Sequence, residues 1–303
     1  MKVLVTGGAG FIGSNLADRL LDLKHNVIVY DDFSIGRHEF LRDNIRLAEG
    51  SILDTEKLAN AMQDCDLVFH LAALSVVYGA ASPQPFIQQN ILGTASVLSA
   101  MEKAGVRKIA FASSQAVYGE HEEPVSESAV SKPISYYGAT KLAGEALIAA
   151  HCKLNNAKAW LFRLANTVGR RQTHGVIFDF IKKLEKDKNK LQILGDGTQR
   201  KSYLLIDECI DAMLLATEKA NESVNLFNVG TPEAIDVKTI AEIVASELGL
   251  QPELAFEDKK EGWPGDQTEI FLNTGKINSL GWHSRHSQAE TIRLAVRQIL
   301  ERD

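Results

Sequence analysis

The sequence predicts an α/β protein built around a doubly wound parallel sheet. Short apolar runs recur along the first half of the chain, and helical patterns separate most of them. The runs cover residues 2–6, 26–30, 45–48, 67–71, 108–112 and 159–164. Strands that alternate with helices form parallel sheets, and runs that are apolar at nearly every position are typical of strands covered on both faces. A glycine-rich turn directly after the first run also favours this fold.

The pattern changes beyond about residue 166, which indicates a second, smaller domain of mixed α/β structure. Helical patterns and short apolar runs follow one another there at 176–188, 191–194, 206–219, 225–229 and 238–248. We expect a first domain over residues 1–165 and a second made of 166–224 and 231–303. The segment 225–230 is expected to return to the main sheet and so to belong to the first domain.

Composition excludes several classes of function. The 303 residues are 45% hydrophobic, which is enough for a sizeable core. A formal net charge of -6 argues against a nucleic-acid partner and against binding to a membrane surface. No apolar stretch approaches the roughly 18 residues of a membrane span. The chain enters a strand directly, without the pattern of a secretory leader, so we expect a cytoplasmic protein.

The cysteines and histidines do not indicate a metal site. Cys65, Cys152 and Cys209 lack the spacing of a metal or disulfide framework, and we expect free thiols in a reducing compartment. The histidines have no carboxylate or cysteine partners at ligand spacing, so we expect no bound metal. His70, at the end of a predicted strand, is expected to be a packed residue.

The glycine-rich turn has the form of a phosphate cradle. Glycines at positions 7, 10 and 13 let a strand turn sharply into a helix, let backbone amides approach a pyrophosphate, and let that helix pack closely on the strand. The helix N-terminus then directs free N–H groups at the anion. Asp31 ends the second run, 18 residues after Gly13, where an acid accepts hydrogen bonds from an adenosine ribose and repels a 2′-phosphate. The sequence therefore predicts a dinucleotide site that prefers NAD to NADP.

A second motif, Tyr137 followed by Lys141, lies at the start of an expected helix. This spacing puts the phenol and the ammonium on one helical face. A neighbouring cation, helped by an oxidised nicotinamide, favours the phenolate and lowers the tyrosine pKa from about 10 toward about 7. Tyr137 could then take a proton from a hydroxyl group whose carbon loses hydride. Ser113 and Ser114 follow the run at 108–112, where a hydroxyl group could hydrogen-bond the reacting oxygen and exchange a proton with Tyr137.

Together these segments resemble the extended short-chain dehydrogenase/reductase family, and within it the UDP-sugar 4-epimerases. The resemblance covers essentially the whole chain and implies a Rossmann fold for the first domain and a nucleotide-sugar site in the second. Besides the two motifs above, it rests on 31–34 (DDFS), 70–73 (HLAA), 90–94 (N-x-x-G-T), 113–119 (SSQAVYG), Asn166 and 195–197 (GDG).

The resemblance implies roles for individual residues. Ser114, Tyr137 and Lys141 are expected to be the catalytic trio. The residues expected at the cofactor, NAD, are Gly7, Gly10, Phe11, Ile12, Gly13, Asp31, Asp32, Ser34, Leu71, Ala72, Ala73, Asn90, Tyr137 and Lys141. Those expected at the substrate, a UDP-sugar, are Ser114, Tyr137, Asn166, Arg200 and Lys201.

The implied reaction inverts C4 of a UDP-hexose through a transient 4-keto sugar, with UDP-glucose and UDP-galactose as the expected pair. A 4-epimerase of UDP-glucuronate or of a UDP-N-acetylhexosamine is an alternative, as is another nucleotide-sugar oxidoreductase of the family. A non-catalytic NAD-binding protein is a third possibility. Gln115 and Ala116 stand where 4,6-dehydratases carry an acid pair, which counts against dehydration.

Two departures from the resembling pattern concern the substrate diphosphate. Lys201 occupies the place of an expected arginine, and because lysine is a point charge and not a bidentate fork, this contact could shift to Arg200. A second expected arginine is Trp263 here. The cations that could substitute for it are Arg170, Arg171 and Lys260.

The helical segments 85–103 and 137–152 predict how the chain associates. Both carry apolar residues that could face outward from the sheet. In the resembling family these two helices form a four-helix dimer interface, so we expect a homodimer of that type. The alternative is that the same residues cover the sheet of a monomer.

Overall fold

A computed structural model describes residues 1–75, 82–121, 123–262 and 267–301. Within it the chain forms two compact units. The first contains residues 1–114, 136–163 and 213–227, and the second contains 115–135, 164–212 and 228–303. Among the described residues, no helix combines the length and the hydropathy that crossing a membrane requires.

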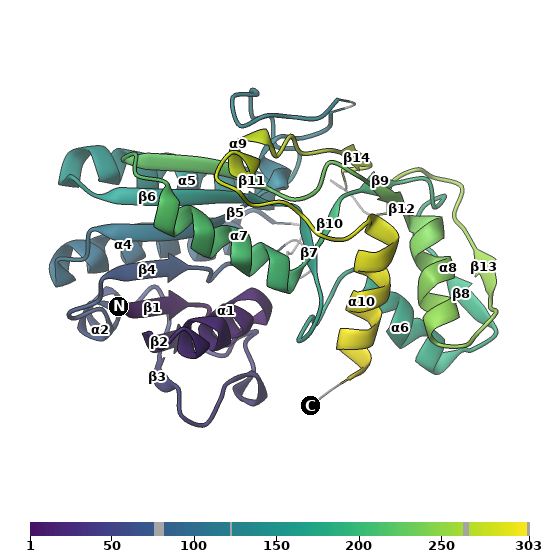
Figure 1. Cartoon of the computed structure of the whole chain (residues 1–303), viewed down its shortest axis with the longest axis horizontal. Coiled ribbons are helices and arrows are strands. Elements are labelled where there is room, and N and C mark those ends of the chain that lie inside the picture. Colours follow the sequence, from purple (N-terminus) through teal and green to yellow (C-terminus); the bar gives the residue numbers. More distant parts are fainter. Residues whose placement is uncertain (76–81, 122, 263–266, 302–303) are drawn as a thin grey trace. The chain divides into compact units, whose positions relative to one another are not determined.

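A seven-stranded sheet runs through the first unit (Figure 1). Its strands are β1 (Lys2–Thr6), β2 (Asn26–Asp31), β3 (Arg46–Glu49), β4 (Leu67–His70), β5 (Lys108–Ser114), β6 (Lys158–Leu164) and β11 (Val224–Val229). Their spatial order is β11-β6-β5-β4-β1-β2-β3, and β1 pairs in parallel with both β2 and β4. Strands β2 and β3 therefore lie on one side of β1, and β4, β5, β6 and β11 lie on the other. This arrangement confirms the predicted doubly wound fold.

The longer helices cover the sheet because they bury apolar side chains against it. The helical elements of the first unit are α1 (Phe11–Asp22), η1 (His38–Phe40), α2 (Thr55–Ala61), α3 (Gln84–Phe86), the π-helix η3 (Ile87–Leu92), α4 (Gly93–Ala104) and α5 (Tyr136–Asn155). α2 packs on α4, and α4 packs on α5. Side chains from these helices and from the strands, among them Leu58, Met101 and Ile148, form one buried apolar core.

The second unit is built from three small sheets and a layer of helices. Its helical elements are η4 (Gln115–Val117), α6 (Val176–Lys186), α8 (Val237–Glu247), α9 (Gly275–Asn278) and α10 (Gln288–Leu300). Its strands are β7 (Asn166–Val168), β8 (Lys190–Gln192), β9 (Arg200–Lys201), β10 (Tyr203–Leu205), β12 (Ile235–Asp236), β13 (Glu253–Ala255) and β14 (Glu269–Ile270). α6, α8 and α10 pack against one another, and β8, which pairs with β13, contacts α6.

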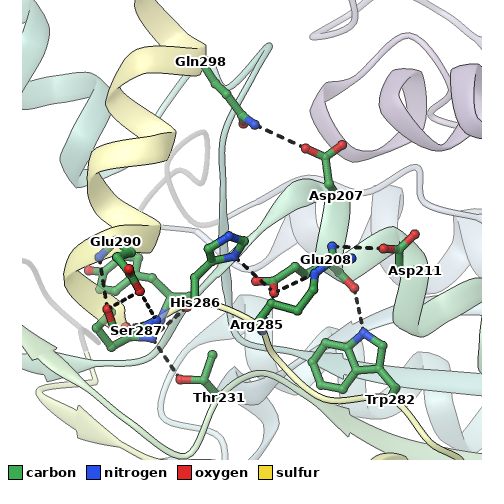
Figure 2. Close-up of polar contacts among 12 residues, drawn as sticks. Asp207, Glu208, Asp211, Thr231, Trp282, Arg285, His286, Ser287, Glu290 and Gln298 are labelled. Carbon is green, nitrogen blue, oxygen red and sulfur yellow. Dashed lines mark hydrogen bonds and ion pairs between the residues drawn. The ribbon is translucent and has the colours of Figure 1, made fainter.

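The first turns of α7 (Ile206–Lys219) anchor the segment that leads into α10 (Figure 2). The backbone N–H of Arg285 and the side chain of His286 contact a carboxylate oxygen of the buried Glu208. The indole of Trp282 donates to the backbone carbonyl of Glu208 over 3.2 Å. Ser287 then begins α10 with a capping box, which satisfies N–H groups of the first turn.

The observed units differ from the expected domains in two long segments and in two short ones, 164–165 and 228–230, which fall in the second unit. Residues 115–135 fall in the second unit, because Val125 forms a bridge with Leu272 and Gln267 donates to the carbonyl of Gly119. Residues 213–224, expected in the second domain, fall in the first, just before β11 enters the sheet beside β6. The contacts of residues 115–135 with Gln267 and Leu272 join positions far apart in sequence, so no local pattern indicates them.

Candidate active site

The glycine turn forms a close-packed cradle between β1 and α1. Gly7 has a φ of +67°, and a Cβ there would lie 2.6 Å from the backbone nitrogen of Ala72. At Gly13 a Cβ would lie 2.1 Å from the carbonyl oxygen of Gly7. Only glycine fits these two positions, and the first turn of α1 contains no acidic residue. The turn therefore fits a diphosphate, which needs close backbone approach and the positive end of a helix.

Asp31 connects this cradle to the end of β2. Its carboxylate accepts one hydrogen bond from the N–H of Ala9 and one from the N–H of Phe33, each 2.9 Å long. Burial raises the pKa of Asp31, although these backbone hydrogen bonds act in the opposite direction. The exposed Asp32 instead accepts from the side chain and the backbone of Ser34. Asp31 thus holds the backbone of the cradle in place, besides its expected contact with the ribose. The spacing of the motif alone does not indicate this structural role.

The segment after β4 lies directly against the glycine turn. The N–H of Leu71 donates to the carbonyl of Thr6, and the N–H of Ala72 reaches the Thr6 hydroxyl at 3.4 Å. Phe11 and Ile12 begin α1 beside this contact, and Ala73 follows Ala72. The structure therefore brings these expected cofactor residues together at the carboxyl ends of β1 and β4, the edge where open α/β sheets bind ligands.

The expected catalytic trio lies at the facing ends of β5 and α5. Ser114 ends β5, and its side chain hydrogen-bonds Tyr137 in the first turn of α5. One turn later, the Lys141 ammonium donates to the carbonyl of Ala112 over 2.7 Å. The same nitrogen lies 4.7 Å from the ring centroid of Phe111 and 5.8 Å from that of Tyr137. All three predicted catalytic residues thus share one small region of the first unit.

The charges at this site differ from the sequence-based expectation. Burial raises the pKa of Tyr137 to about 12, and the hydrogen bond with Ser114 only partly opposes this. Burial also lowers the pKa of Lys141 to about 7, while the negative charge of Glu145 acts to raise it. The groups of the chain itself therefore favour the neutral phenol, because removal from water disfavours both charged forms. The predicted lowering of the Tyr137 pKa needs positive charge beyond that of Lys141.

Asn90 lies in the π-helix η3, which contacts α5. Its side-chain oxygen accepts from the N–H of Leu74, and its amide nitrogen donates to the Leu74 carbonyl and to the Thr140 hydroxyl. Thr140 in turn donates to the carbonyl of Tyr137 over 2.9 Å. Asn90 therefore holds the start of α5 and the segment after β4 in a fixed relation, and π-helical turns often mark such sites.

His70 extends this hydrogen-bonded network toward the glycine turn. Its ring lies between the hydroxyls of Thr6 and Thr94, at 2.8 and 3.0 Å. Since Thr94 donates to the carbonyl of Asn90, its oxygen is left to accept from Nε2 of His70, and Nδ1 then accepts from Thr6. Burial lowers the pKa of His70 to about 3, so the ring is neutral. This agrees with the predicted packed residue.

The residues expected at the substrate diphosphate lie in the second unit. Asn166 donates from its backbone and its side chain to the carbonyl of Ser202, directly after Lys201. Lys201 is buried in β9, whereas the exposed Arg200 lies 3.9 Å from a carboxylate oxygen of Glu269. Alternation along the strand thus puts the two cations on opposite faces.

One of the three cations that could substitute for the second arginine, Arg170, is already in an ion pair. It lies 2.6 Å from Asp207, and both side chains are exposed. Trp263 lies outside the described residues. Within the described ranges, no three His, Cys, Asp or Glu side chains form a group that could hold a metal ion.

Sequence reasoning missed one buried polar group beneath the trio. Glu145 and Arg163 form an ion pair at 2.7 Å with both side chains almost fully buried, and Ser113 donates to the same carboxylate. The spacing of Glu145 from Lys141 looks like an ordinary surface pair. A usable signal was Arg163, a charged residue inside a run that is otherwise apolar and predicted to be covered on both faces.

Comparisons with known proteins agree with this site. The model of the NAD dependent epimerase/dehydratase family matches residues 3–230. This chain belongs to that family. A UDP-glucose 4-epimerase of Mycolicibacterium smegmatis is 33% identical over 307 residues, covering 96% of each chain.

Two solved structures extend the likeness to the whole fold. One is of a UDP-galactose 4-epimerase, with 38% identity, a TM-score of 0.90 and 98% of each chain covered. The other is a UDP-glucuronic acid 4-epimerase from Bacillus cereus in complex with UDP-glucuronic acid and NAD, with 28% identity, a TM-score of 0.89 and 99% of each chain covered. These findings confirm the predicted family and NAD as the cofactor of its members.

Proposed function

We propose that this chain is a UDP-hexose 4-epimerase that interconverts UDP-galactose and UDP-glucose through a transient 4-keto sugar. The observation that carries the proposal is the grouping of Ser114, Tyr137 and Lys141 at the ends of β5 and α5. Its support from relatives is similarity over essentially the whole chain to UDP-glucose and UDP-galactose 4-epimerases.

The glycine cradle is the part of the chain that would hold NAD. Gly7, Gly10 and Gly13 would receive the diphosphate, for which their missing side chains leave room. Asp31, beside the cradle, would accept hydrogen bonds from the adenosine ribose. When bound, NAD would supply a reversible hydride acceptor for C4 and, in its oxidised form, positive charge that favours the Tyr137 phenolate.

The chain's own groups would move the proton. Tyr137 takes the proton of the sugar 4-hydroxyl and gives it back when C4 is reduced on its other face. Ser114 hydrogen-bonds the phenol and can hold the reacting oxygen beside it. Lys141, fixed on the Ala112 carbonyl, supplies positive charge on the same helical face. Firm contacts are required only to the UDP half, because the sugar must turn over between the two hydride transfers.

Elimination of water is the reaction that the site supports least. Gln115 and Ala116, which follow Ser114 in η4, provide no carboxyl group that could act as acid or base. Gln115 is buried, with 5% of its surface exposed. An epimerase needs neither group, since Tyr137 serves both half-reactions.

A panel of nucleotide sugars tests this function. The purified protein is incubated with UDP-galactose, UDP-N-acetylgalactosamine, UDP-galacturonate and dTDP-galactose, and the products are separated by chromatography, with Tyr137→Phe as the control. We expect UDP-galactose to give UDP-glucose. Preference for the acetamido sugar or the uronate would replace the proposed substrate by that one, and conversion of no sugar would refute an epimerase.

A further inference from the structure

A buried ion pair lies under the catalytic residues of the first unit. Two nitrogens of Arg163, on β6, donate to the two carboxylate oxygens of Glu145, on α5, over 3.0 and 2.7 Å. Glu145 is 6% exposed and Arg163 is 5% exposed. Burial of two charges is costly, and apolar residues of similar size often serve stability as well or better. Stability alone is therefore a poor explanation for this pair.

The pair contacts the catalytic region through Ser113. The Ser113 hydroxyl donates to Oε1 of Glu145 over 2.5 Å. In the chain, Ser113 stands between Ala112 and Ser114. The Ala112 carbonyl accepts a hydrogen bond from the Lys141 ammonium, and the Ser114 side chain is hydrogen-bonded to Tyr137. Movement of Ser113 would therefore displace both of these contacts.

Helix α5 repeats this attachment at three successive turns. Tyr137, Lys141 and Glu145 are four residues apart, so they lie on one helical face. Each contacts one of three consecutive residues at the end of β5. Beside Glu145, Gly144 permits the close approach, because a Cβ there would lie 2.9 Å from the Phe111 ring. Glu145 thus completes a row of contacts that sets the position of α5 along β5.

We propose that Glu145, held by Arg163, is a positioning residue that fixes the end of β5 so that Ser114 and the Ala112 carbonyl stay aligned with Tyr137 and Lys141. The assignment rests on the proposed function for the reaction that it serves. The contacts themselves lie entirely within the first unit. The hydrogen bond from Ser113 links Glu145 to the end of β5. The Glu145 carboxylate also adds negative charge near Lys141.

The charge of Glu145 gives the proposal a signature in the pH profile. The described charged and titratable groups around Lys141 are Tyr137 and Glu145 on α5, Arg163 on β6, and His70 on β4. Of these, Glu145 favours the protonated ammonium. Without this charge Lys141 releases its proton at lower pH, so the alkaline limb of kcat moves to lower pH.

Two variants separate position from charge. Ser113→Ala keeps the ion pair and breaks its link to β5, whereas Glu145→Gln keeps the shape and removes the charge. We expect each to lower kcat by about 10- to 100-fold, with KM changed less than about 2-fold, because small misplacements cost rate and not binding. Only Glu145→Gln should move the alkaline limb. Glu56→Gln, which removes an exposed ion pair with Lys103, is the matched control and should change neither quantity.

The outcomes distinguish the alternatives. A lower melting temperature in Ser113→Ala and Glu145→Gln, with kcat and the pH profile unchanged, would make the pair merely structural and overturn the proposal. If Glu145→Gln does not fold, Ser113→Ala alone decides it by its kcat and KM. If the wild-type protein converts no UDP-sugar, the proposed function fails first. Titration of ¹³Cε-labelled Lys141 by NMR then tests the charge that the proposal assigns to Glu145: a midpoint lowered in Glu145→Gln but not in Ser113→Ala supports it, and an unchanged midpoint in both refutes it.

Discussion

Tyr137 illustrates how burial and function oppose one another at a single residue. The residue as a whole is half-buried, and the removal of its phenol from water raises its pKa to about 12. A residue that must exchange protons near neutral pH is thus kept protonated by the chain and requires added positive charge to ionise. The pairing with Lys141 was visible in the sequence, whereas the direction of the shift was not, because desolvation depends on tertiary packing.

Removal of the phenolic oxygen should stop the reaction and leave the fold intact. We expect Tyr137→Phe to lower kcat by about 10² to 10⁴-fold, the usual contribution of a positioned acid or base. The phenyl ring preserves the packing, so the melting temperature should stay within a few degrees of that of the wild-type protein. Steady-state kinetics with UDP-galactose checks this. A variant that retains full kcat would show that another group carries the proton.

His70 should make the protein sensitive to acid. Its folded pKa is about 3, below the ordinary value of 6.5, so the unfolded chain binds a proton first as pH falls. The contribution is fully present above pH 6.5 and decreases by about 1.4 kcal/mol per pH unit between 6.5 and 3. In His70→Gln this loss is absent, so the stability advantage of the wild-type protein should shrink over that range. Urea unfolding at pH 7.5, 6.5, 5.5 and 4.5 measures it; an advantage independent of pH would contradict the neutral ring.

At the scale of elements, the turn between β1 and α1 depends on the absence of one methyl group. A Cβ at position 13 would lie 2.1 Å from the Gly7 carbonyl oxygen, and this oxygen is a backbone atom that cannot move aside. We expect Gly13→Ala to lower NAD affinity by more than about 10-fold, because the cradle must open to admit the methyl group. Gly105→Asn is the control: Gly105 has a φ of +74° with open space around it, which asparagine tolerates. Calorimetric titration with NAD that shows equal affinities would remove the cradle from the cofactor site.

The strands were the elements most readily predicted. The six apolar runs agree with β1 to β6 to within about two residues at nearly every end, because buried parallel strands carry their signal in consecutive residues. The π-helix η3 was not predicted. It contains Asn90, whose side chain hydrogen-bonds Leu74 and Thr140, and such contacts leave no periodic pattern. Glu145 was missed for the same reason, whereas Arg163 left a signal inside an apolar run.

At the scale of the whole molecule, we propose that the chain forms a homodimer through α4 and α5 with their neighbouring turns. Leu92 in η3 and Leu154 in α5 are 53% and 83% exposed, which supports a covered surface there. Light scattering at micromolar concentration should give about twice the chain mass of 33.2 kDa. Leu92→Glu should lower that mass, and Leu300→Glu, on the exposed part of α10, should not. A monomeric mass for the wild-type protein would rule the dimer out.

The two-unit organisation was predicted in outline and not in detail. A change of pattern near residue 166 indicated a second domain, and β11 lies beside β6 in the main sheet. The assignment of 115–135 depends on contacts with residues near 267–273, about 150 positions away. Such pairings are set by the folded chain, and composition does not report them.

The fate of a deuterium label at C4 tests the central claim most directly. UDP-galactose deuterated at that carbon is converted by the protein, and the product is examined by NMR and mass spectrometry. Hydride that leaves C4 and returns to the same carbon should leave the label in UDP-glucose, without accumulation of NADH. Loss of the label to solvent, or stoichiometric release of NADH, would contradict a redox-neutral inversion in which Tyr137 carries only the proton.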